Sequence, residues 1–459
     1  MIYFLGIGGI GMSALAQWCK QQGLAIAGYD RARTAITEGL EAQGINISYQ
    51  DDSDTIPEEF IAEHPGRLVV YTPAIPRENR IRITLEQLGV PFLKRSEMLG
   101  MVTEPYFTVA VAGTHGKTTT CSMIGHMLKQ SNRASTSFIG GITQNYGSNI
   151  ILEPEAVQDQ VVVVEADEFD RSFLTLNPDV AVITAMDADH LDIYGDVDHM
   201  HQSFRDFLSR IKPGGKVFIN NRVYQQLKDH IPSGVTGYSY GIESGFFSAT
   251  QVAIKDNTFI FDFTSPDINM DQLNLGMPGF HNVENAMSAI AVGWSLGLDE
   301  KEIRKALASY TGVKRRFEFI INESNLIFID DYAHHPVEIK ALLYSVKKLF
   351  PDQPITAVFQ PHLFSRTKDF AVEFGSSLSL ASEVYLLDIY PAREKPIPGV
   401  TSNLIGKELT VPYHLVTTDN VVEELSKKRH QVVLTIGAGD IDQLVQPIKE
   451  ALEDHDKDK

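Results

Sequence analysis

The chain has 459 residues, about three times the length of a typical domain, so we expect roughly two to four domains that each bury a core. Hydrophobic residues make up 43% and charged residues 22%, a globular composition that excludes disorder as the main state. The 40 Lys and Arg against 59 Asp and Glu give a net charge of −19, which argues against nucleic acid as a partner. An anionic small substrate then needs local cations and backbone amides.

The cysteines and the chain start indicate the compartment. Cys19 and Cys121 are far apart and have no Cys or His at metal-ligand spacing beside them, so neither a disulfide framework nor a structural zinc site is predicted. The chain enters a strand pattern at Met1 without a basic segment or cleavage site, and its apolar runs are shorter than the ~18 residues of a membrane helix. We therefore expect a cytoplasmic protein without a signal peptide.

The first predicted elements form a β-α-β unit with a glycine-rich turn. A strand at 2–5, a helix at 12–22 and a strand at 25–29 follow one another, and strands at 68–71 and 90–93 continue the pattern to about residue 102. The turn GIGGIG matches G-x-G-x-x-G, and Asp30 ends the second strand. The backbone amides of this turn can bind a pyrophosphate, and Asp30 can bind the hydroxyls of a ribose. Any nucleotide diphosphate, including NAD, is therefore a candidate ligand. An ordinary glycine turn is the alternative.

A second α/β region begins with a strand at 106–112, the sequence GTHGKTTT and a helix at 121–130. This resembles a phosphate loop, although Val111 stands where a full Walker A motif has its first glycine. Lys117 would place its charge on the β and γ phosphates and Thr118 would offer a hydroxyl to Mg²⁺. A glycine turn with a solvated lysine is the alternative.

Acidic residues follow the next two apolar strands, at 161–164 and 180–184. The carboxyl ends of parallel strands meet at one edge of a sheet, so Glu165 is the expected metal ligand, whereas Glu168 could simply favour a helix start. Asp189 and His190 would reach the same edge, where His190 is a candidate metal ligand or substrate contact, with a structural role as the alternative.

The second domain should end near Arg316, after a helix at 283–298. Asn282 and Asn285 lie three residues apart, on one helix face, where their amides could read a purine edge. One of them could instead be an N-cap; of the two, Asn282 is the better cap and Asn285 the better ligand.

A third α/β domain is predicted from strands at 326–329, 355–359, 384–389 and 432–436, alternating with helices at 337–349 and 369–380. Polar clusters at 330–336 and 360–367 follow two of these strands. Arg366 and the Lys314–Arg316 run can supply positive charge for anionic ligands, with a solvated charge run as the alternative for Arg316. The cluster at 388–394 has no assignable role, and the charged tail at 453–459 reads as a solvated end.

Seven motifs in order carry a resemblance over nearly the whole chain: GTHGKTTT, EADE, ADHLD, GFHNVENA, VKRRFE, DDYAHHP and FQPH. They resemble the motifs of the Mur ligase family, which adds amino acids to the peptidoglycan precursor. The resemblance implies an α/β fold of three domains. These are an N-terminal Rossmann-like UDP-substrate domain at 1–102, a central P-loop ATPase-like domain at 103–316 and a C-terminal Rossmann-like domain at 317–459, which would close when ATP binds, with a hinge near Arg316.

The segments GIGGIGMS, DDYAHHP, FQPH with SRT, and DIYPAREKPIPG are similar to the alanine-adding branch of that family. This implies joining L-alanine to the carboxylate of UDP-N-acetylmuramate through an acyl phosphate, with ATP and Mg²⁺. The muropeptide-recycling branch shares the RRFE-like and HHP elements but differs at the glycine loop and lacks FQPH. Later ligases of the pathway usually carry a modified lysine where this chain has Arg205.

The resemblance also implies roles for individual residues. Catalysis would involve Lys117, Glu165, His190 and Arg366, and Mg²⁺ would be held by Thr118, Glu165 and His190. ATP would contact Gly113, Thr114, His115, Gly116, Lys117, Thr118, Thr119, Asn282, Asn285, Arg315 and Asp331. The other substrates would contact Gly8, Gly9, Ile10, Gly11, Met12, Ser13, Asp30, Tyr332, His334, His335 and Arg366. Leu363 stands where many alanine-adding ligases have an arginine, which leaves the alanine carboxylate to Arg366.

Two other classes of protein compete with this interpretation. An NAD-dependent dehydrogenase would account for the first glycine loop but leaves the Lys117 loop unexplained. A non-enzymatic nucleotide-binding regulator would use the same loops to sense ATP without chemistry. A phosphate-release assay with ATP, UDP-N-acetylmuramate and alanine separates all three.

Overall fold

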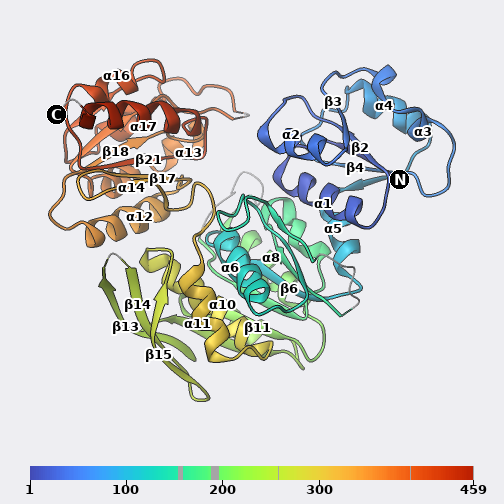
Figure 1. The fold of residues 1–459 in the computed structure, drawn as a ribbon, viewed down its shortest axis with the longest axis horizontal. Helices are drawn as coiled ribbons and strands as arrows, with labels where there is room; N and C mark the ends of the chain where they lie inside the picture. The colour runs from blue at the N-terminus through green and yellow to red at the C-terminus, as the bar shows by residue number, and fades with distance from the viewer. Residues whose placement is uncertain (154–158, 188–195, 257, 393, 458–459) are drawn as a thin grey trace. The chain divides into compact units, whose positions relative to one another are not determined.

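A computed structural model describes residues 1–153, 159–187, 196–256, 258–392 and 394–457 (Figure 1). The chain separates into two compact units, one of residues 1–251, 261–274 and 284–311, the other of residues 252–260, 275–283 and 312–459. Three sheets organise the fold, with five, ten and six strands among the described residues. No helix in this part of the chain is both long and apolar enough to cross a membrane.

The first sheet is entirely parallel, with the order β3-β2-β1-β4-β5. The order reverses at β1, so the glycine loop after this strand lies where open α/β sheets bind ligands. The apolar residues of β1 alternate between two hydrophobic clusters, one on each face. The elements are β1 (Ile2–Leu5), α1 (Ile10–Gln21), β2 (Ile26–Tyr29), α2 (Ala35–Ala42), β3 (Asn46–Ser48), α3 (Glu58–Ile61), β4 (Leu68–Tyr71), α4 (Arg80–Gln87), β5 (Phe92–Lys94) and α5 (Arg95–Thr103).

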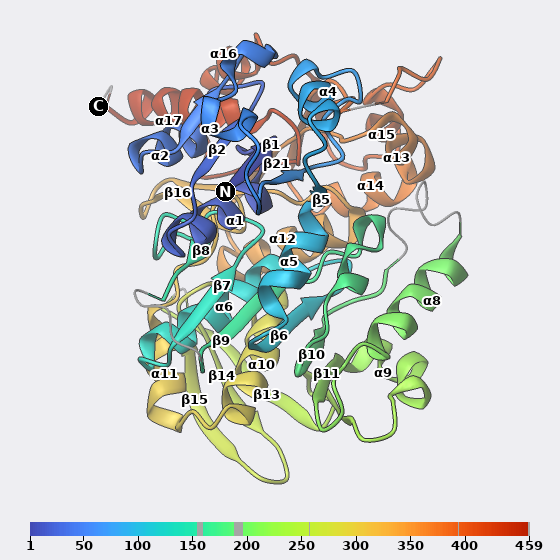
Figure 2. The same cartoon turned by 90° about the vertical axis from the view of Figure 1, so that its right-hand side faces the viewer.

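The second sheet places the strand before the phosphate loop between two strands that lead to acidic residues, Glu165 at the end of one and Asp187 after the other. In its order β15-β14-β13-β12-β11-β10-β6-β9-β7-β8, β6 pairs in parallel with both β9 and β10 (Figure 2). All three strands are buried apolar runs, as a parallel sheet covered on both faces requires. The strands are β6 (Phe107–Ala112), β7 (Ser135–Phe138), β8 (Ile150–Ile151), β9 (Val161–Glu165), β10 (Val180–Ile183), β11 (Lys216–Asn220), β12 (Thr236–Ile242), β13 (Phe247–Lys255), β14 (Thr258–Thr264) and β15 (Asn269–Leu275).

Helices flank this sheet. One of them, α6, follows the phosphate loop directly and packs against β6, β7 and β9. The described helices are α6 (Lys117–Gln130), the 3-10 helix η2 (Phe169–Thr175), α8 (Val197–Leu208), α9 (Asn221–Leu227), the 3-10 helix η3 (Lys228–His230), α10 (Phe280–Ser295) and α11 (Glu300–Ser309).

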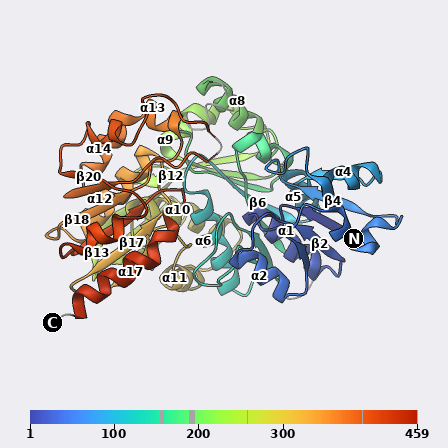
Figure 3. The same cartoon turned by 90° about the horizontal axis from the view of Figure 1, so that it is seen from above.

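The third sheet has the order β16-β17-β21-β18-β19-β20, with β16 antiparallel and the other strands parallel. Helices cover both of its faces, α17 on one and α12 with α14 on the other (Figures 1 and 3). The elements are β16 (Glu318–Asn322), β17 (Ile327–Asp331), α12 (Pro336–Leu349), β18 (Ile355–Phe359), α13 (Phe364–Asp369), α14 (Ala371–Leu378), β19 (Glu383–Leu386), α15 (Asn403–Gly406), β20 (Tyr413–Leu415), α16 (Val421–Ser426), β21 (Val432–Ile436) and α17 (Asp442–Lys457).

The structure corrects several predicted boundaries. The helix predicted at 369–380 is α14, which begins at Ala371 and ends at Leu378; α13 before it was not predicted, and Phe370 separates the two helices at φ −120° and ψ 21°. The strand predicted at 384–389 ends at Leu386, and the helix predicted at 283–298 begins three residues earlier and ends at Ser295. Strands β12 to β15 were not predicted from the sequence at all.

Candidate active site

The phosphate loop adopts a conformation that glycine alone accommodates. Gly113 has a φ of +132° and Gly116 a φ of +79°, both in the region that L side chains avoid. A Cβ added at Gly116 would lie 2.5 Å from Oδ1 of Asn285, and one added at Gly113 would lie 2.8 Å from the amide nitrogen of Ala185. Because α6 begins at Lys117, the loop presents a helix N-terminus, which suits an anion.

Lys117 is held in a buried ion pair that the sequence analysis did not predict. Its Nζ lies 2.7 Å from Oε2 and 2.9 Å from Oε1 of Glu168, and it donates to the Gly113 carbonyl at 2.7 Å. Burial disfavours the ammonium, but Glu168, Asp167 and Glu165 outweigh it and raise the pKa of Lys117. The lysine is therefore protonated, and Glu168, interpreted from sequence as a possible helix start, is its counter-ion.

Glu165 and Thr118 lie together, as the strand-end pattern predicted. The Thr118 hydroxyl donates to Oε2 of Glu165 at 2.9 Å, and the amide of Gly140 donates to the same oxygen at 2.9 Å. A hydroxyl beside a carboxylate is a donor set that Mg²⁺ prefers, so the two residues fit this metal chemically. No described group of three His, Cys, Asp or Glu forms a metal cluster, and His190 with Asp189 lies outside the described residues.

The segment after β10 also contacts the phosphate loop. The amide of Asp187 donates to Oγ1 of Thr114 at 3.1 Å, and Nε2 of His115 lies 3.6 Å from Oδ2 of Asp187. Thr119, the last predicted loop contact, is buried in the first turn of α6, and its carbonyl accepts a hydrogen bond from the Ser122 hydroxyl at 2.9 Å. The ends of β6, β9 and β10 thus converge on one site.

The two asparagines of α10 have different roles. The prediction that Asn282 is the better N-cap is wrong, because α10 already begins at Phe280, after Gly279 at φ +119°. Asn282 lies within the first turn and its side chain donates to the Pro278 carbonyl at 2.6 Å. Asn285 accepts a hydrogen bond from Thr120 at 3.3 Å and lies against Gly116. The structure therefore places Asn285 at the phosphate loop.

The first glycine loop is closed by Asp30. Its Oδ2 accepts the amide of Gly8 at 2.8 Å, and its Oδ1 accepts that of Ala32 at 3.2 Å. Met12 and Ser13 are buried in the first turns of α1, and Gly9, Ile10 and Gly11 form the start of this helix. Asn149, which the sequence analysis missed, donates to the Ser13 hydroxyl at 2.8 Å. Asp30 and Asn149 thus hold the two ends of this loop in place.

Replacing Gly8 with valine is expected to weaken binding of a uridine nucleotide at least about tenfold. A Cβ at Gly8 would lie 2.7 Å from Cγ2 of Thr37 and 2.9 Å from Oδ2 of Asp30, so the loop amides must shift. Gly39→Val is the matched control, because nothing lies within 4 Å of a Cβ there. Calorimetry with the uridine nucleotide measures the effect, with ATP binding to show that the variant folds; unchanged nucleotide affinity would refute this role for the loop.

In the other unit, Asp331 and Arg315 fix the segment that leads into β16. Asp331 accepts the amides of Phe317 and Ala333 at 2.7 Å each, and burial raises its pKa to about 6. Arg315 lies 3.1 Å from Asp330 and donates to the Gly437 carbonyl at 2.7 Å. Arg316 lies 3.8 Å from Glu338 and its guanidinium carbon lies 5.0 Å from the centre of the Tyr332 ring, with 29% of its side chain exposed, so it is partly solvated and partly packed.

Aromatic and histidine rings gather at the carboxyl ends of β17 and β18. His334 lies 5.4 Å from the ring of Tyr332 and 6.0 Å from that of His362, which stacks on Tyr390 at 5.7 Å. His362 and Tyr390 were not predicted as site residues. His335 is buried as the N-cap of α12, a structural position, so its ring is less available to a ligand than that of His334.

Arg366 lies on α13 with 8% of its surface exposed. The N-cap of this helix is Leu363, whose φ of +73° is unusual for a branched side chain, and the amide of Leu363 donates to the Tyr390 carbonyl at 2.9 Å. Glu394 accepts from the amide of Ser365 at 3.0 Å; its burial is outweighed by the bonds from Ser365, which lower its pKa. Arg366 follows His362 of the ring cluster by four residues, and the helix that carries it is anchored at its start.

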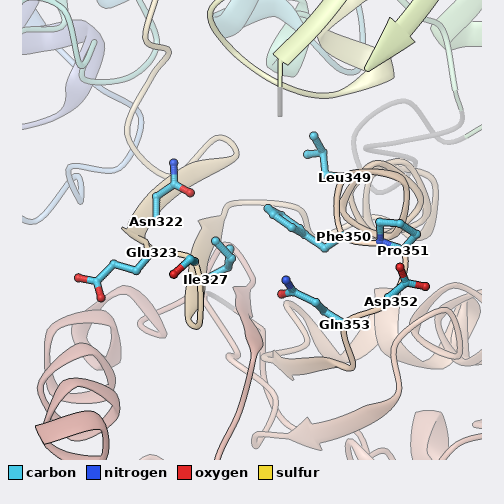
Figure 4. A pocket seen from close by; sticks show the side chains of 9 residues that line it. Asn322, Glu323, Ile327, Leu349, Phe350, Pro351, Asp352 and Gln353 are labelled. Atoms are coloured by element: carbon cyan, nitrogen blue, oxygen red, sulfur yellow. The ribbon is translucent and has the colours of Figure 1, made fainter. Parts of the chain in front are cut away.

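A polar cavity of about 340 Å³ lies at the other end of β17 (Figure 4). Ile327, which lines it, begins the strand that Asp331 ends, so the two lie about 13 Å apart along the chain. This cavity is separate from the candidate site. Its lining residues are Asn322, Glu323, Ser324, Ile327, Leu349, Phe350, Pro351, Asp352 and Gln353.

Comparisons with known proteins agree with this geometry. Three family models match the chain in order: the Mur ligase family catalytic domain at 1–106, the Mur ligase middle domain at 111–293, and the Mur ligase glutamate ligase domain at 315–439. The chain belongs to the Mur ligase family, whose members are ATP-dependent.

Similar proteins narrow the class. The chain is 45% identical over 452 residues to the UDP-N-acetylmuramate--L-alanine ligase of Christiangramia forsetii, covering 98% of this chain and 97% of the relative. It is 43% identical to the enzyme of that name in Cytophaga hutchinsonii, in an alignment that covers 98% of this chain and 96% of the relative. The solved structure of the UDP-N-acetylmuramate-alanine ligase of Thermotoga maritima superposes with a TM-score of 0.80 at 28% identity, and the superposition covers 100% of this chain and 99% of that one.

Proposed function

We propose that this chain is the ligase that joins L-alanine to the carboxylate of UDP-N-acetylmuramate in the synthesis of the peptidoglycan precursor. The observation that carries the proposal is that relatives of this name are 41–45% identical over nearly the whole chain. The site supports it, because a phosphate loop with a protonated lysine and a separate glycine loop provide for two phosphorylated ligands. Since ATP and UDP-activated sugars are cytoplasmic metabolites, the reaction would take place in the cytoplasm.

We keep the division into domains at 1–102, 103–316 and 317–459 as part of this proposal. Each range contains the strands of one sheet, β1 to β5, β6 to β15 and β16 to β21. The first would bind the UDP substrate, the second ATP, and the third alanine.

Thr118 and Glu165 would hold Mg²⁺, with His190 as the further predicted ligand. When bound there, the metal would offset charge on the phosphates of ATP. Lys117 would add its ammonium to the same phosphates, for which it must turn from Glu168 towards the γ phosphate.

The reaction needs two steps. A carboxylate oxygen of UDP-N-acetylmuramate attacks the γ phosphorus of ATP; the bond to the β-γ bridging oxygen breaks, ADP leaves, and an acyl phosphate forms. The amine of alanine then attacks the acyl carbon, the carbon–oxygen bond to phosphate breaks, and the amine loses its proton as the amide forms. Lys117 and the loop amides stabilise charge on the transferring phosphoryl group in the first step. Water must be excluded, because it would hydrolyse the acyl phosphate.

Alanine would bind at the ring cluster of the third sheet. Tyr332 and His334 lie at the end of β17, and Arg315 and Arg316 have their guanidinium carbons 5.3 and 5.0 Å from the centre of the Tyr332 ring. Arg366 would bind the alanine carboxylate, because Leu363 has no charge to offer. The planar fork of arginine matches a carboxylate.

Replacing Arg366 with lysine is expected to raise the KM for alanine about tenfold and to change the KM for ATP little, because lysine keeps the charge but loses the bidentate fork. Steady-state kinetics with each substrate varied in turn measure this. Lys368→Arg, on the same helix, is the control. If Arg366 only packs, the variant loses stability and all three KM values change together; an unchanged alanine KM in a folded variant would exclude the assignment.

The function itself is tested by phosphate release. Protein with ATP, Mg²⁺, UDP-N-acetylmuramate and L-alanine should release phosphate and form UDP-N-acetylmuramoyl-L-alanine, seen by mass spectrometry. A free muropeptide in place of alanine tests the recycling branch, and NAD tests the dehydrogenase. Turnover with muropeptide but not with alanine, or NAD reduction without phosphate release, would overturn the proposal.

A further inference from the structure

The first glycine loop has little positive charge of its own. Lys20 is the only Lys or Arg between residues 1 and 29, and its Nζ contacts the Gly44 carbonyl at 3.4 Å, at the far end of α1 from the loop. One loop amide, that of Gly8, already donates to Asp30. Arg31 and Arg33 follow Asp30, and Arg33 is paired with Glu38 and Glu41. In a protein of net charge −19, a pyrophosphate at this loop therefore depends on cations outside the loop itself.

Arg95, the first residue of α5, lies against this loop. A Cβ added at Gly11 would lie 2.9 Å from Cδ and 3.0 Å from Nη1 of Arg95, so the guanidinium rests on the start of α1. Neither composition nor motif spacing indicated this residue. A guanidinium beside open amides at a helix start is a donor set that suits a phosphate.

The side chain of Arg95 is available for a ligand. Among the described residues its ion-pair partner is Asp167, with Nη2 and Oδ2 3.8 Å apart, beyond hydrogen-bond distance, and the two side chains are 25% and 39% exposed. A long ion pair between two partly exposed side chains contributes little to stability. The guanidinium can therefore exchange this partner for a phosphate at low cost.

The backbone under Arg95 is fixed. The Glu97 carboxylate accepts the amide of Lys94 at 2.6 Å, and the Thr175 hydroxyl donates to the Ser96 carbonyl at 2.9 Å. Gly100 packs so closely on η2 that a Cβ there would lie 2.6 Å from the Thr175 carbonyl oxygen. The guanidinium is thus positioned at the loop by an anchored helix rather than by a mobile segment.

We propose that Arg95 is a substrate-binding residue that contacts the pyrophosphate of the UDP substrate at the first glycine loop. The inference rests on the proposed function, which supplies the pyrophosphate. The contact replaces a weak pair with Asp167 by charge-assisted hydrogen bonds to phosphate oxygens. Asp167 follows Glu165 and precedes Glu168, so Arg95 also lies beside the strand end where ATP is expected.

Calorimetry with UDP-N-acetylmuramate and with UDP tests the proposal without ATP. Arg95→Ala should weaken binding of both about 10- to 100-fold, Arg95→Lys should restore part of the loss, and Lys20→Ala, which removes the same charge far from the loop, should change binding little. Asp167→Asn should keep the affinity, because it removes the partner and leaves the guanidinium. In turnover, the Arg95 variants should raise the KM for the UDP substrate and leave that for ATP nearly unchanged.

The outcomes separate cleanly. Equal losses for UDP and UDP-N-acetylmuramate support the pyrophosphate contact. A loss for UDP-N-acetylmuramate alone would assign Arg95 to the muramate carboxylate and overturn the proposal. Unchanged affinity in a folded Arg95→Ala variant would also overturn it. So would an equal loss of affinity in Asp167→Asn, because the ion pair would then have a structural role. If the wild-type protein turns over the substrates and Arg95→Ala has the same KM for the UDP substrate, the proposed function stands and this inference fails.

Discussion

Replacing Lys117 with alanine is expected to lower turnover about a thousandfold, because a charge that stabilises the transferring phosphoryl group contributes several kcal/mol to lowering the barrier. The side chain is buried and already protonated in its pair with Glu168, so its ammonium reaches the phosphates without a change of charge state. Binding of UDP-N-acetylmuramate should stay nearly unchanged, because the first glycine loop is a separate element. Single-turnover kinetics and calorimetry measure the two effects.

Lys129→Ala is the matched control for this variant, since Lys129 lies in the last turn of the same helix, α6. A second variant guards against misfolding: the Lys117→Ala change leaves Glu168 buried without its partner, so Lys117→Ala combined with Glu168→Gln should recover stability but not turnover. Wild-type turnover in either folded variant would refute the assignment of the phosphate loop.

Replacing Glu165 with glutamine is expected to weaken the apparent affinity for Mg²⁺ roughly 10- to 100-fold and to lower turnover at low Mg²⁺, because a carboxylate ligand is lost. Glutamine can still accept the hydrogen bonds from Thr118 and Gly140, so the loop should keep its shape. Turnover measured against Mg²⁺ concentration gives the effect, with partial recovery expected at high Mg²⁺.

Glu104→Gln controls for the loss of one negative charge, because Glu104 lies before the amino end of β6, away from the phosphate loop. Its Mg²⁺ dependence should match that of the wild type. If Glu165→Gln shows the same Mg²⁺ dependence as this control, Glu165 is not a metal ligand and its bond to Thr118 is structural.

The parallel strands could be predicted from sequence because they are buried on both faces and read as short apolar runs. The strands at 2–5, 68–71, 355–359 and 432–436 have the predicted bounds. Strands β13 to β15 were missed because they are not continuous apolar runs: in β14 every second residue is buried and the others are polar or partly exposed, an alternation that itself favours a strand. Their pairing depends on contacts that no local pattern encodes.

Some contacts of the candidate site could likewise be predicted from sequence and others could not. The adjacency of Thr118 and Glu165 could be predicted, because neighbouring parallel strands end at one edge. The contacts of Glu168, Asn149 and Arg95 could not, because these residues lie outside the strands, in loops or at a helix start, where no strand-end rule fixes their neighbours. The predicted cap at Asn282 was wrong because the helix start is set by Gly279 and by the ring of Phe280, which packs 5.0 Å from that of Phe259.

The placement of β6 between β9 and β10 also affects how the chain matures on the ribosome. The neighbours of β6 are both translated later, and Asn285, which lies against Gly116, is translated later still. The ribosome adds 172 residues between Gly113 and Asn285, which takes roughly 10 to 30 s at about 5–20 residues per second. The strands β9 and β10 are completed within that interval and Asn285 only at its end, so the surroundings of the lysine loop are complete only after more than half of the chain has been made.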